Sequence, residues 1–399
     1  MDTVVPGSVG LSTSRLERIT GTLHRWVDER QAAGFVALIA RRGKVGYFES
    51  VGLQDLEAGV PMERDAIFRI YSMTKPITTA AVMMLLEEGR FLLDDPIADF
   101  IPEFAQTKVF VRETPEGMEL ADLERPLTIR HLLTHTSGLI YGGAPNGDAL
   151  DRAYAEAGMP RPNVALAEYS AWLASLPLAF QPGDSWAYGV SIDVLGRLVE
   201  VVSGQRFGAF LEERLFCRLG MADTGFSVPP EKASRLAPVY TPAEDGKLMR
   251  DDSPLGFDWS SAFESGGGGL FSTAADYYRF AQMLLSSGQL DGTRLLGRKM
   301  VELMAAPQSF RDRSLIRVAP SWAFSRGYAM ALGVRTVVDV GEAGLPGSVG
   351  SYNWEGVAST AFSVDPKEDL LTILMFQRLP GYSRPYELFR SLTYAALDD

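Results

Sequence analysis

The stretch Tyr71-Ser72-Met73-Thr74-Lys75-Pro76 places a serine three residues before a lysine, at the start of a run rich in Ala, Met and Leu. The run extends from Pro76 to Glu88 and stops at Gly89, which predicts a helix. Three residues are nearly one helical turn, so the Ser72 hydroxyl and the Lys75 amine fall on the same side. Ser72 is the only serine that stands three positions before any of the seven lysines.

This spacing suits nucleophilic chemistry. A helix N-terminus carries a partial positive charge, which stabilises a developing oxyanion and lowers the pKa of Lys75, and partial burial lowers that pKa further. A neutral Lys75 would then accept the proton of Ser72. Pro76 lacks an N–H and restricts Lys75, so we expect an irregular helix start. The alternative interpretation is an ordinary N-cap serine followed by a surface lysine.

Strand patterns lie at both ends of the chain, outside this helix. Residues 35–50 predict one hairpin, and residues 358–364 and 370–376 predict a second. Residues 335–340 predict a further strand. Helices are expected from Ser14, which begins a capping-box pattern, and over residues 385–397.

The middle of the chain is mostly helical. The economical arrangement pairs the N- and C-terminal strands antiparallel, which brings the termini together. We therefore predict an α/β (α+β) fold, an antiparallel sheet flanked by helices. Residues 1–80 and 184–399 would form the α/β domain, and residues 81–183 an inserted helical domain.

Other catalytic patterns are weak or missing. His24, His131 and His135 are the only histidines, and we interpret all three as structural. No serine stands in a G-x-S-x-G elbow, which disfavours a Ser-His-Asp esterase. The run Gly266–Gly269 does not extend to a dinucleotide-binding pattern, and Cys217 is the only cysteine. We therefore expect no metal and no organic cofactor.

Composition excludes several partners. The 399 residues include 38 basic and 50 acidic side chains, a net charge of −12, which disfavours nucleic acid. No apolar run approaches the ~20 residues of a membrane span. The first residues show no secretory signal, which predicts a cytoplasmic protein with a small-molecule substrate. The oligomeric state is left open.

A second segment, Arg130-His131-Leu132-Leu133-Thr134-His135-Thr136-Ser137-Gly138-Leu139, follows the first in the chain. Together the two resemble the serine hydrolases of the β-lactamase-like superfamily. The closest likeness is to family VIII carboxylesterases and related polyketide acyltransferases, which share their fold with class C β-lactamases and D-alanyl-D-alanine peptidases. The resemblance runs from about residue 12 to the C-terminus and implies a class C β-lactamase-like fold.

The resemblance implies roles for further residues. Tyr188 follows the Pro182-Gly183 turn and precedes a helix, and it would share protons with Lys75 and Ser72. Trp354-Glu355-Gly356-Val357 falls where the family carries its third motif on an edge strand. The backbone N–H groups of Ser72 and Val357 would form the oxyanion hole, with Trp354 and Gly356 binding substrate.

Two departures from the family favour esters. The triplet usually has Gly where this chain has Glu355, and the position two after Tyr188 is Val190, whereas lactamases and peptidases commonly have Asn. We therefore expect a serine carboxylesterase that hydrolyses esters with small to medium apolar acyl groups through an acyl-enzyme on Ser72. Residues 255–263 would line its pocket.

The alternatives are a β-lactamase or D-alanyl-D-alanine peptidase, an acyltransferase of a secondary-metabolite pathway, and a binding protein without catalysis. The resemblance also leaves open whether Lys75 or Tyr188 is the base in each half-reaction.

Overall fold

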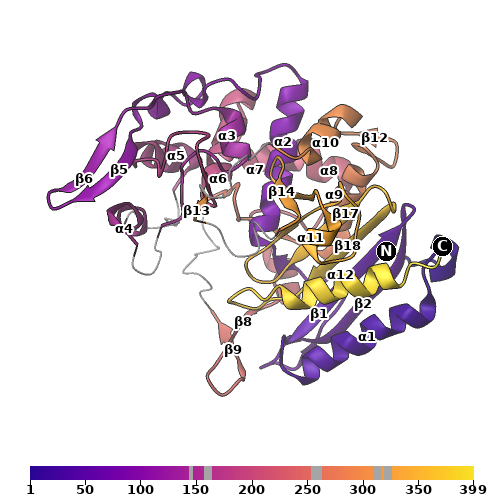
Figure 1. The fold of residues 1–399 in the computed structure, drawn as a ribbon. Coiled ribbons are helices and arrows are strands. Elements are labelled where there is room, and N and C mark those ends of the chain that lie inside the picture. The colour runs from indigo at the N-terminus through magenta and orange to yellow at the C-terminus, as the bar shows by residue number, and fades with distance from the viewer. Residues whose placement is uncertain (143–146, 157–163, 253–262, 309–315, 319–325) are drawn as a thin grey trace.

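The structure is a computed structural model that describes residues 1–142, 147–156, 164–252, 263–308, 316–318 and 326–399. Its centre is an eight-stranded antiparallel sheet (Figure 1). In spatial order the strands are β14 (Tyr328–Met330), β15 (Arg335–Val337), β16 (Tyr352–Glu355), β17 (Ala361–Asp365), β18 (Leu370–Met375), β1 (Gly34–Arg41), β2 (Lys44–Asp55) and β3 (Val60–Pro61).

The two ends of the chain meet in this sheet. β1 pairs with β18 from Val36 opposite Met375 to Arg41 opposite Leu370. β1–β2 and β17–β18 are the two predicted hairpins, and both predictions are confirmed. The N- and C-termini lie close together (Figure 1). Near them, the Ser12 N–H donates a hydrogen bond to the Ala396 carbonyl at 2.8 Å. The antiparallel α/β fold is therefore the one predicted.

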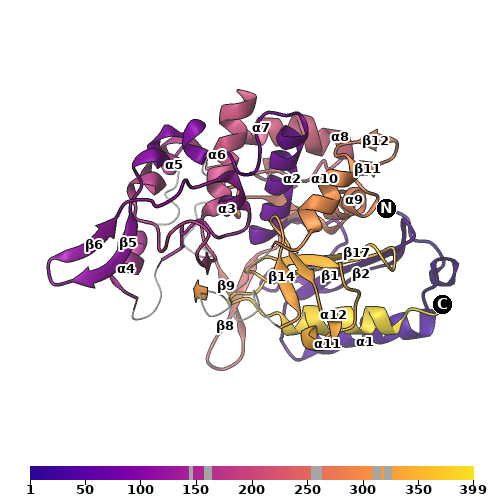
Figure 2. The same ribbon diagram turned by 45° about the horizontal axis from the view of Figure 1, so that its top comes forward.

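Helices cover both faces of the sheet (Figures 1 and 2). α1 (Thr13–Asp28) and α12 (Arg384–Ala395) cover one face and contact each other, while α2 (Thr74–Glu87) and α9 (Ala274–Leu285) lie on the other. In β1, alternate residues serve the two cores: Phe35, Ala37 and Ile39 face α1 and α12, and Val36, Leu38 and Ala40 face the opposite core. A strand buried on both faces reads as a continuous apolar run, as β1 does.

A mostly helical region packs beyond α2, where α6 contacts α2, α3 and α5 (Figure 2). Its α-helices and those that follow are α3 (Ile129–Leu133), α4 (Ala149–Glu156), α5 (Leu166–Ser175), α6 (Ser191–Ser203), α7 (Phe207–Leu211), α8 (Cys217–Leu219), α10 (Arg298–Ala305) and α11 (Val340–Ala343). Shorter turns are η1 (Pro6–Val9), η2 (Tyr71–Met73), η3 (Ile97–Asp99), η4 (Pro102–Gln106), the π-helical η5 (Glu212–Phe216) and η6 (Pro230–Arg235). The predicted domain boundary at 80/81 falls inside α2, and the division into 1–80 with 184–399 and 81–183 stays a prediction.

Five small two-stranded sheets complete the fold. β4 (Phe68–Arg69) pairs with β10 (Phe271–Ser272), which brings the segment before Ser72 beside the end of the Gly266–Gly269 run. The others pair β7 (Trp186–Ala187) with β13 (Ile316–Val318), β5 (Val109–Thr114) with β6 (Gly117–Ala121), β8 (Val239–Pro242) with β9 (Leu248–Asp251), and β11 (Gln289–Leu290) with β12 (Thr293–Arg294).

Two local predictions are wrong. The first helix begins at Thr13 with Ser12 as its N-cap, so the pattern from Ser14 is not a capping box. The strand expected over 335–340 ends at Val337, because Asp339 caps α11 by accepting a hydrogen bond from the Glu342 N–H. Within the described residues, no helix is long and apolar enough to cross a membrane.

Candidate active site

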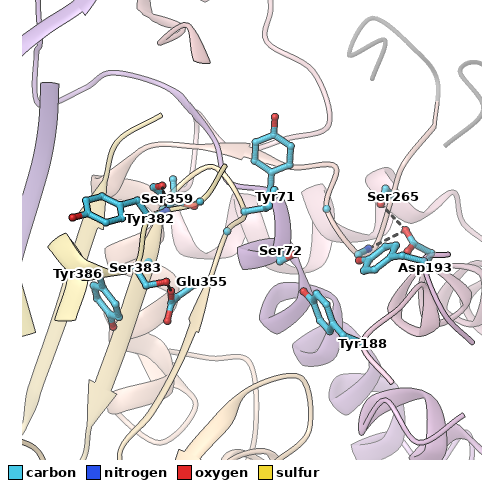
Figure 3. A pocket seen from close by; sticks show the side chains of 18 of the residues that line it. Tyr71, Ser72, Tyr188, Asp193, Ser265, Glu355, Ser359, Tyr382, Ser383 and Tyr386 are labelled. Atoms are coloured by element: carbon cyan, nitrogen blue, oxygen red, sulfur yellow. Dashed lines mark hydrogen bonds between the residues drawn. The ribbon is translucent and has the colours of Figure 1, made fainter. Parts of the chain in front are cut away.

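Ser72 lies in the 3-10 turn η2, directly before α2. Hydrogen bonds fix both ends of this turn. Before it, the Ile70 N–H donates to the Leu270 carbonyl, and at its end the Tyr277 hydroxyl donates to the Met73 carbonyl at 2.9 Å. Tyr71 has φ +42°, a left-handed conformation that costs a non-glycine residue energy and persists only where surrounding contacts enforce it. The strained turn exposes the Ser72 side chain to a cavity (Figure 3).

The helix start is irregular, as Pro76 predicts. Pro76 is the third residue of α2, where an N–H would have no intrahelical acceptor, so the missing donor costs little. Before it, the chain passes from 3-10 to α geometry.

Lys75 is fully buried beneath Ser72, which excludes the alternative of a surface lysine. Its ammonium donates to three oxygens: Ser72 Oγ at 3.1 Å, the Tyr141 hydroxyl at 3.1 Å and the Gly267 carbonyl at 2.7 Å. Three acceptors match the three protons of an ammonium group. Lys75 is thus placed to exchange a proton with Ser72 or to hold a negative charge beside it.

The predicted direction of the Lys75 pKa is wrong. Burial alone lowers this pKa, as the sequence suggests, but the charge interactions with Tyr141, Tyr188 and Asp193 outweigh burial and raise the pKa above its usual value. The reason is tertiary, because none of these groups lies near Lys75 in the chain. Lys75 is therefore an ammonium at neutral pH.

Tyr188 follows β7 and lies over Lys75, whose Nζ is 4.7 Å from the centre of the Tyr188 ring. The ring stacks on Trp186 at 6.1 Å, meets His135 at 4.9 Å and Tyr141 at 5.5 Å. The structure thus brings Tyr188 beside the Ser72–Lys75 pair, from which it lies far away in the chain. Their catalytic roles stay a prediction.

These side chains border a cavity of about 500 Å³. It lies between the C-terminal end of β16, which is an inner strand of the sheet, the turn at Ser72 and the start of α6 (Figure 3). Among the described residues, no Lys or Arg lines it. The lining consists of Tyr71, Ser72, Tyr141, Tyr188, Asp193, Phe263, Ser265, Gly267, Gly268, Glu355, Gly356, Val357, Ser359, Thr360, Ala361, Gly381, Tyr382, Ser383 and Tyr386. Of the predicted lining segment 255–263, only Phe263 lies within the described residues.

Gly356 and Val357 lie where β16 ends against the Ser72 turn. The Gly356 N–H donates to the Thr360 carbonyl at 2.7 Å. A Cβ at position 356 would lie 2.4 Å from the Ile70 carbonyl oxygen, so only glycine permits this close approach. The approach brings Val357 to the same cavity as Ser72. An oxyanion hole made by their two N–H groups stays a prediction.

Trp354 differs from its predicted role as a pocket wall. Its side chain is fully buried and is not among the described residues that line the cavity. It packs behind the site, with its ring 5.9 Å from that of Tyr188. Alternation along β16 turns Trp354 into the core and Glu355 toward the cavity. Substrate binding by Trp354 stays a prediction.

Glu355 is paired rather than free in solvent. Its carboxylate forms an ion pair with Arg335 and accepts a hydrogen bond from Ser383 Oγ at 3.0 Å. Arg335 in turn donates to Asn353 Oδ1 at 2.6 Å. The negative charge of Glu355, at the position where the family usually has glycine, is therefore neutralised by Arg335 within the cavity wall.

The histidines are structural, as interpreted from the sequence. His24 lies exposed on α1. His131 takes part in the N-cap of α3. Its ring Nδ1 accepts a hydrogen bond from the Thr128 backbone N–H at 3.2 Å, and its backbone N–H donates to Thr128 Oγ1. His135 is fully buried against Tyr188, and burial holds its pKa well below the usual value. Across the described ranges, no three His, Cys, Asp or Glu side chains gather as a metal site.

Sequence analysis missed three groups at the site: Tyr141, Asp193 and the Gly267 carbonyl. Tyr141 stands two residues after the Gly138-Leu139 end of the second family segment, a proximity that could have drawn attention to it. The glycine run at 266–269 was noted only for close packing. Asp193 offers no signal in the sequence, because its burial beside Lys75 depends on how α6 packs on α2.

The structure thus combines an antiparallel α/β fold with a Ser-x-x-Lys pair at a helix start and a tyrosine beside it. The sequence profile of the Beta-lactamase family matches residues 20–395, so the chain belongs to that family.

Individual relatives cover nearly the whole chain. Esterase EstB from Burkholderia gladioli is 34% identical over 410 residues, which cover 96% of each chain. Protein Rv1367c from Mycobacterium tuberculosis is 37% identical over 362 residues, covering 89% of this chain and 88% of the relative. The solved structure of EstCE1, described as a hydrolase with promiscuous acyltransferase activity, superposes with a TM-score of 0.80 at 26% identity and covers 96% of this chain and 98% of its own.

Proposed function

We propose that this protein is a serine carboxylesterase that hydrolyses esters of small to medium apolar acyl groups. The observation that carries the proposal is the buried Lys75 amine, which is hydrogen-bonded to Ser72 Oγ at 3.1 Å and lies 4.7 Å from the centre of the Tyr188 ring, beside a cavity of about 500 Å³. Its relatives EstB and EstCE1, an esterase and a hydrolase, support an esterase or acyltransferase of this fold acting on small molecules.

The geometry favours Tyr188 as the base. Because Lys75 is an ammonium, it has no free electron pair for the Ser72 proton, but its positive charge stabilises a negative Tyr188 oxygen. Tyr188 takes the Ser72 proton as Ser72 Oγ bonds to the ester carbonyl carbon, and the Ser72 and Val357 N–H groups hold the oxyanion.

The remaining steps return the enzyme to its starting state. The tetrahedral intermediate collapses, the carbon–oxygen bond to the alcohol breaks, and Tyr188 returns its proton to the leaving alkoxide. Water then attacks the Ser72 ester, gives its proton to Tyr188, and the acid leaves as Ser72 regains the proton. An alcohol in place of water gives acyl transfer, which the description of EstCE1 keeps open as a second function.

The cavity wall argues against β-lactam or peptide substrates. Such substrates carry a carboxylate, and a buried carboxylate needs a cationic or hydrogen-bonding partner. The charged side chains on the described wall are the acidic Asp193 and Glu355. Val190, where an amide-binding Asn would stand, is fully buried and is not among the described lining residues.

The test measures hydrolysis of p-nitrophenyl esters, from acetyl to octanoyl, by the wild type and by Ser72→Ala. We expect turnover in the wild type, none above background in Ser72→Ala, and wild-type rates in Ser175→Ala, whose exposed hydroxyl bonds only to its own helix. The chain-length optimum measures the acyl pocket.

Further substrates and a covalent probe separate the alternatives. Equal activity in wild type and Ser72→Ala contradicts the proposal. Turnover of a chromogenic cephalosporin at rates matching the esters would indicate a β-lactamase, and acylation of an added alcohol faster than hydrolysis would indicate an acyltransferase. If a fluorophosphonate fails to label Ser72, a binding protein without catalysis is favoured.

A further inference from the structure

Asp193 is a fully buried carboxyl group that the proposed reaction does not use. It is the third residue of α6, has 3% of its surface exposed, and contributes to the inner end of the cavity. Its Oδ1 accepts two hydrogen bonds, from Ser265 Oγ at 2.5 Å and from the Gly267 N–H at 3.0 Å (Figure 3). Buried carboxylates are costly, so a partnered one beside an active site calls for a functional explanation.

The Gly267 residue connects Asp193 with Lys75. Its N–H donates to Asp193, and its carbonyl accepts the shortest of the three hydrogen bonds from the Lys75 ammonium, at 2.7 Å. A Cβ at position 267 would lie 2.5 Å from Asp193 Oδ2, and one at Gly266 would lie 2.6 Å from the Ile192 carbonyl oxygen. Side chains at positions 266 and 267 would therefore clash with α6, and the two glycines allow the backbone to lie directly against this helix.

A buried ammonium needs a compensating negative charge. Within the described residues Lys75 forms no direct ion pair, while the Asp193 carboxylate acts on it electrostatically. The titratable groups that surround Asp193 are Lys75 from α2, Tyr141, and Tyr169 from α5. Burial raises the pKa of both tyrosine hydroxyls.

We propose that Asp193 is a positioning residue whose carboxylate fixes the Gly267 backbone against Lys75 and keeps Lys75 an ammonium directed at Ser72 and Tyr188. Its effect on rate rests on the function proposed above; its effect on Lys75 does not. Burial raises the pKa of Asp193, while the hydrogen bonds from Ser265 and the Gly267 N–H and the positive charge of Lys75 oppose that rise.

Asp193→Asn tests the charge, because the amide Oδ1 can still accept both hydrogen bonds. Asp276→Asn is a matched control: Asp276 is also buried, accepts from Thr224 Oγ1 at 2.9 Å and from the Asp223 N–H at 2.7 Å, and does not line the cavity. Burial raises the pKa of both carboxyls, so each carboxylate costs stability at neutral pH. We expect neither variant to unfold at a lower temperature.

The first readout is the pH profile of kcat/KM for p-nitrophenyl esters. Removing the negative charge lowers the pKa of Lys75, so the alkaline limb moves to lower pH by about one unit. On the alkaline limb this shift lowers kcat/KM by up to about tenfold, because one unit changes the protonation ratio tenfold, whereas at neutral pH Lys75 stays an ammonium in both proteins. The Asp276→Asn profile should superimpose on that of the wild type. A weakened Asp193→Asn enzyme with an unshifted profile would show a merely structural role and overturn the proposal.

The second readout does not depend on turnover. With only seven lysines, the side-chain carbon-13 signal of Lys75 can be assigned in labelled protein by its loss in Lys75→Met. We expect its titration to move to lower pH in Asp193→Asn and to stay in place in Asp276→Asn. An unchanged Lys75 titration refutes the inference whether or not the wild type cleaves esters, whereas an inactive wild type with a shifted Lys75 refutes only the esterase proposal.

Discussion

Two tyrosine hydroxyls reach Lys75, and their surroundings differ. Tyr141 accepts a hydrogen bond from Nζ at 3.1 Å, while the Tyr188 ring lies over the ammonium at 4.7 Å and packs against Trp186, His135 and Trp354. Aromatic packing on several sides restricts the Tyr188 ring to one orientation. This restriction suits a group that must transfer a proton, whereas Tyr141 needs only to accept one hydrogen bond.

At this scale we predict different losses for two matched variants. Tyr188→Phe removes the proposed base and should lower kcat by about 10²- to 10⁴-fold. Tyr141→Phe removes one acceptor of a charged donor and should lower kcat by about 10- to 100-fold. Steady-state kinetics of both variants with the same p-nitrophenyl ester show which substitution lowers kcat more. A larger loss in Tyr141→Phe would reverse the assignment of the base.

The short helix α3 is stabilised by His131. Its Nδ1 accepts from the Thr128 N–H, and protonation would remove this acceptor. Burial, with smaller effects of Arg125 and Arg130, lowers the pKa of His131 to about 4, although Asp94 opposes the shift. Because the unfolded chain binds this proton more readily, the stabilising contribution is complete above pH 6.5 and is lost as pH falls toward 4.

His131→Asn tests this contribution, because Asn Oδ1 occupies nearly the place of Nδ1 and does not titrate. We expect the wild type to lose up to about 3 kcal/mol of unfolding free energy relative to the variant between pH 7 and 4, less what solvent screens. Urea unfolding at several pH values measures the difference. A difference that stays constant with pH would contradict the prediction.

Across the whole molecule, the ends of the chain enclose one face of the sheet. α12 covers Phe35, Leu374 and Phe376 together with α1, and the last residues bond back to the N-terminal segment. Burying such a side chain contributes about 1.5–3 kcal/mol, so the face as a whole exceeds the typical net stability of about 5–15 kcal/mol.

Removing residues 384–399 should therefore expose this face and abolish cooperative unfolding. Removing only residues 398 and 399 should be tolerated, because it deletes the partly exposed ion pairs of Asp399 with Arg41 and Arg42 and leaves α12 in place. Thermal unfolding followed by near-ultraviolet circular dichroism distinguishes the two. A cooperative transition in the longer truncation would show that α12 is dispensable to the fold.

Local patterns were sufficient to predict the hairpins β1–β2 and β17–β18, the helices α2 and α12, and the Ser72–Lys75 pair. Each depends on residues close together in the chain, where periodicity, caps and turn residues act directly. The pairing of β1 with β18 followed from economy of arrangement. Tyr188 and Val357 came from the resemblance, since nothing local distinguishes Tyr188 from the other 13 tyrosines.

Packing between distant segments decided the electrostatics of the site. The helix start alone suggested a neutral Lys75, but Tyr141, Tyr188 and Asp193 come from two other segments of the chain and reverse the direction of its pKa. The inward turn of Trp354 and the pairing of Glu355 with Arg335 are likewise properties of the assembled sheet. Charge interactions depend on distance in space and on burial, and neither quantity is a property of a short stretch of sequence.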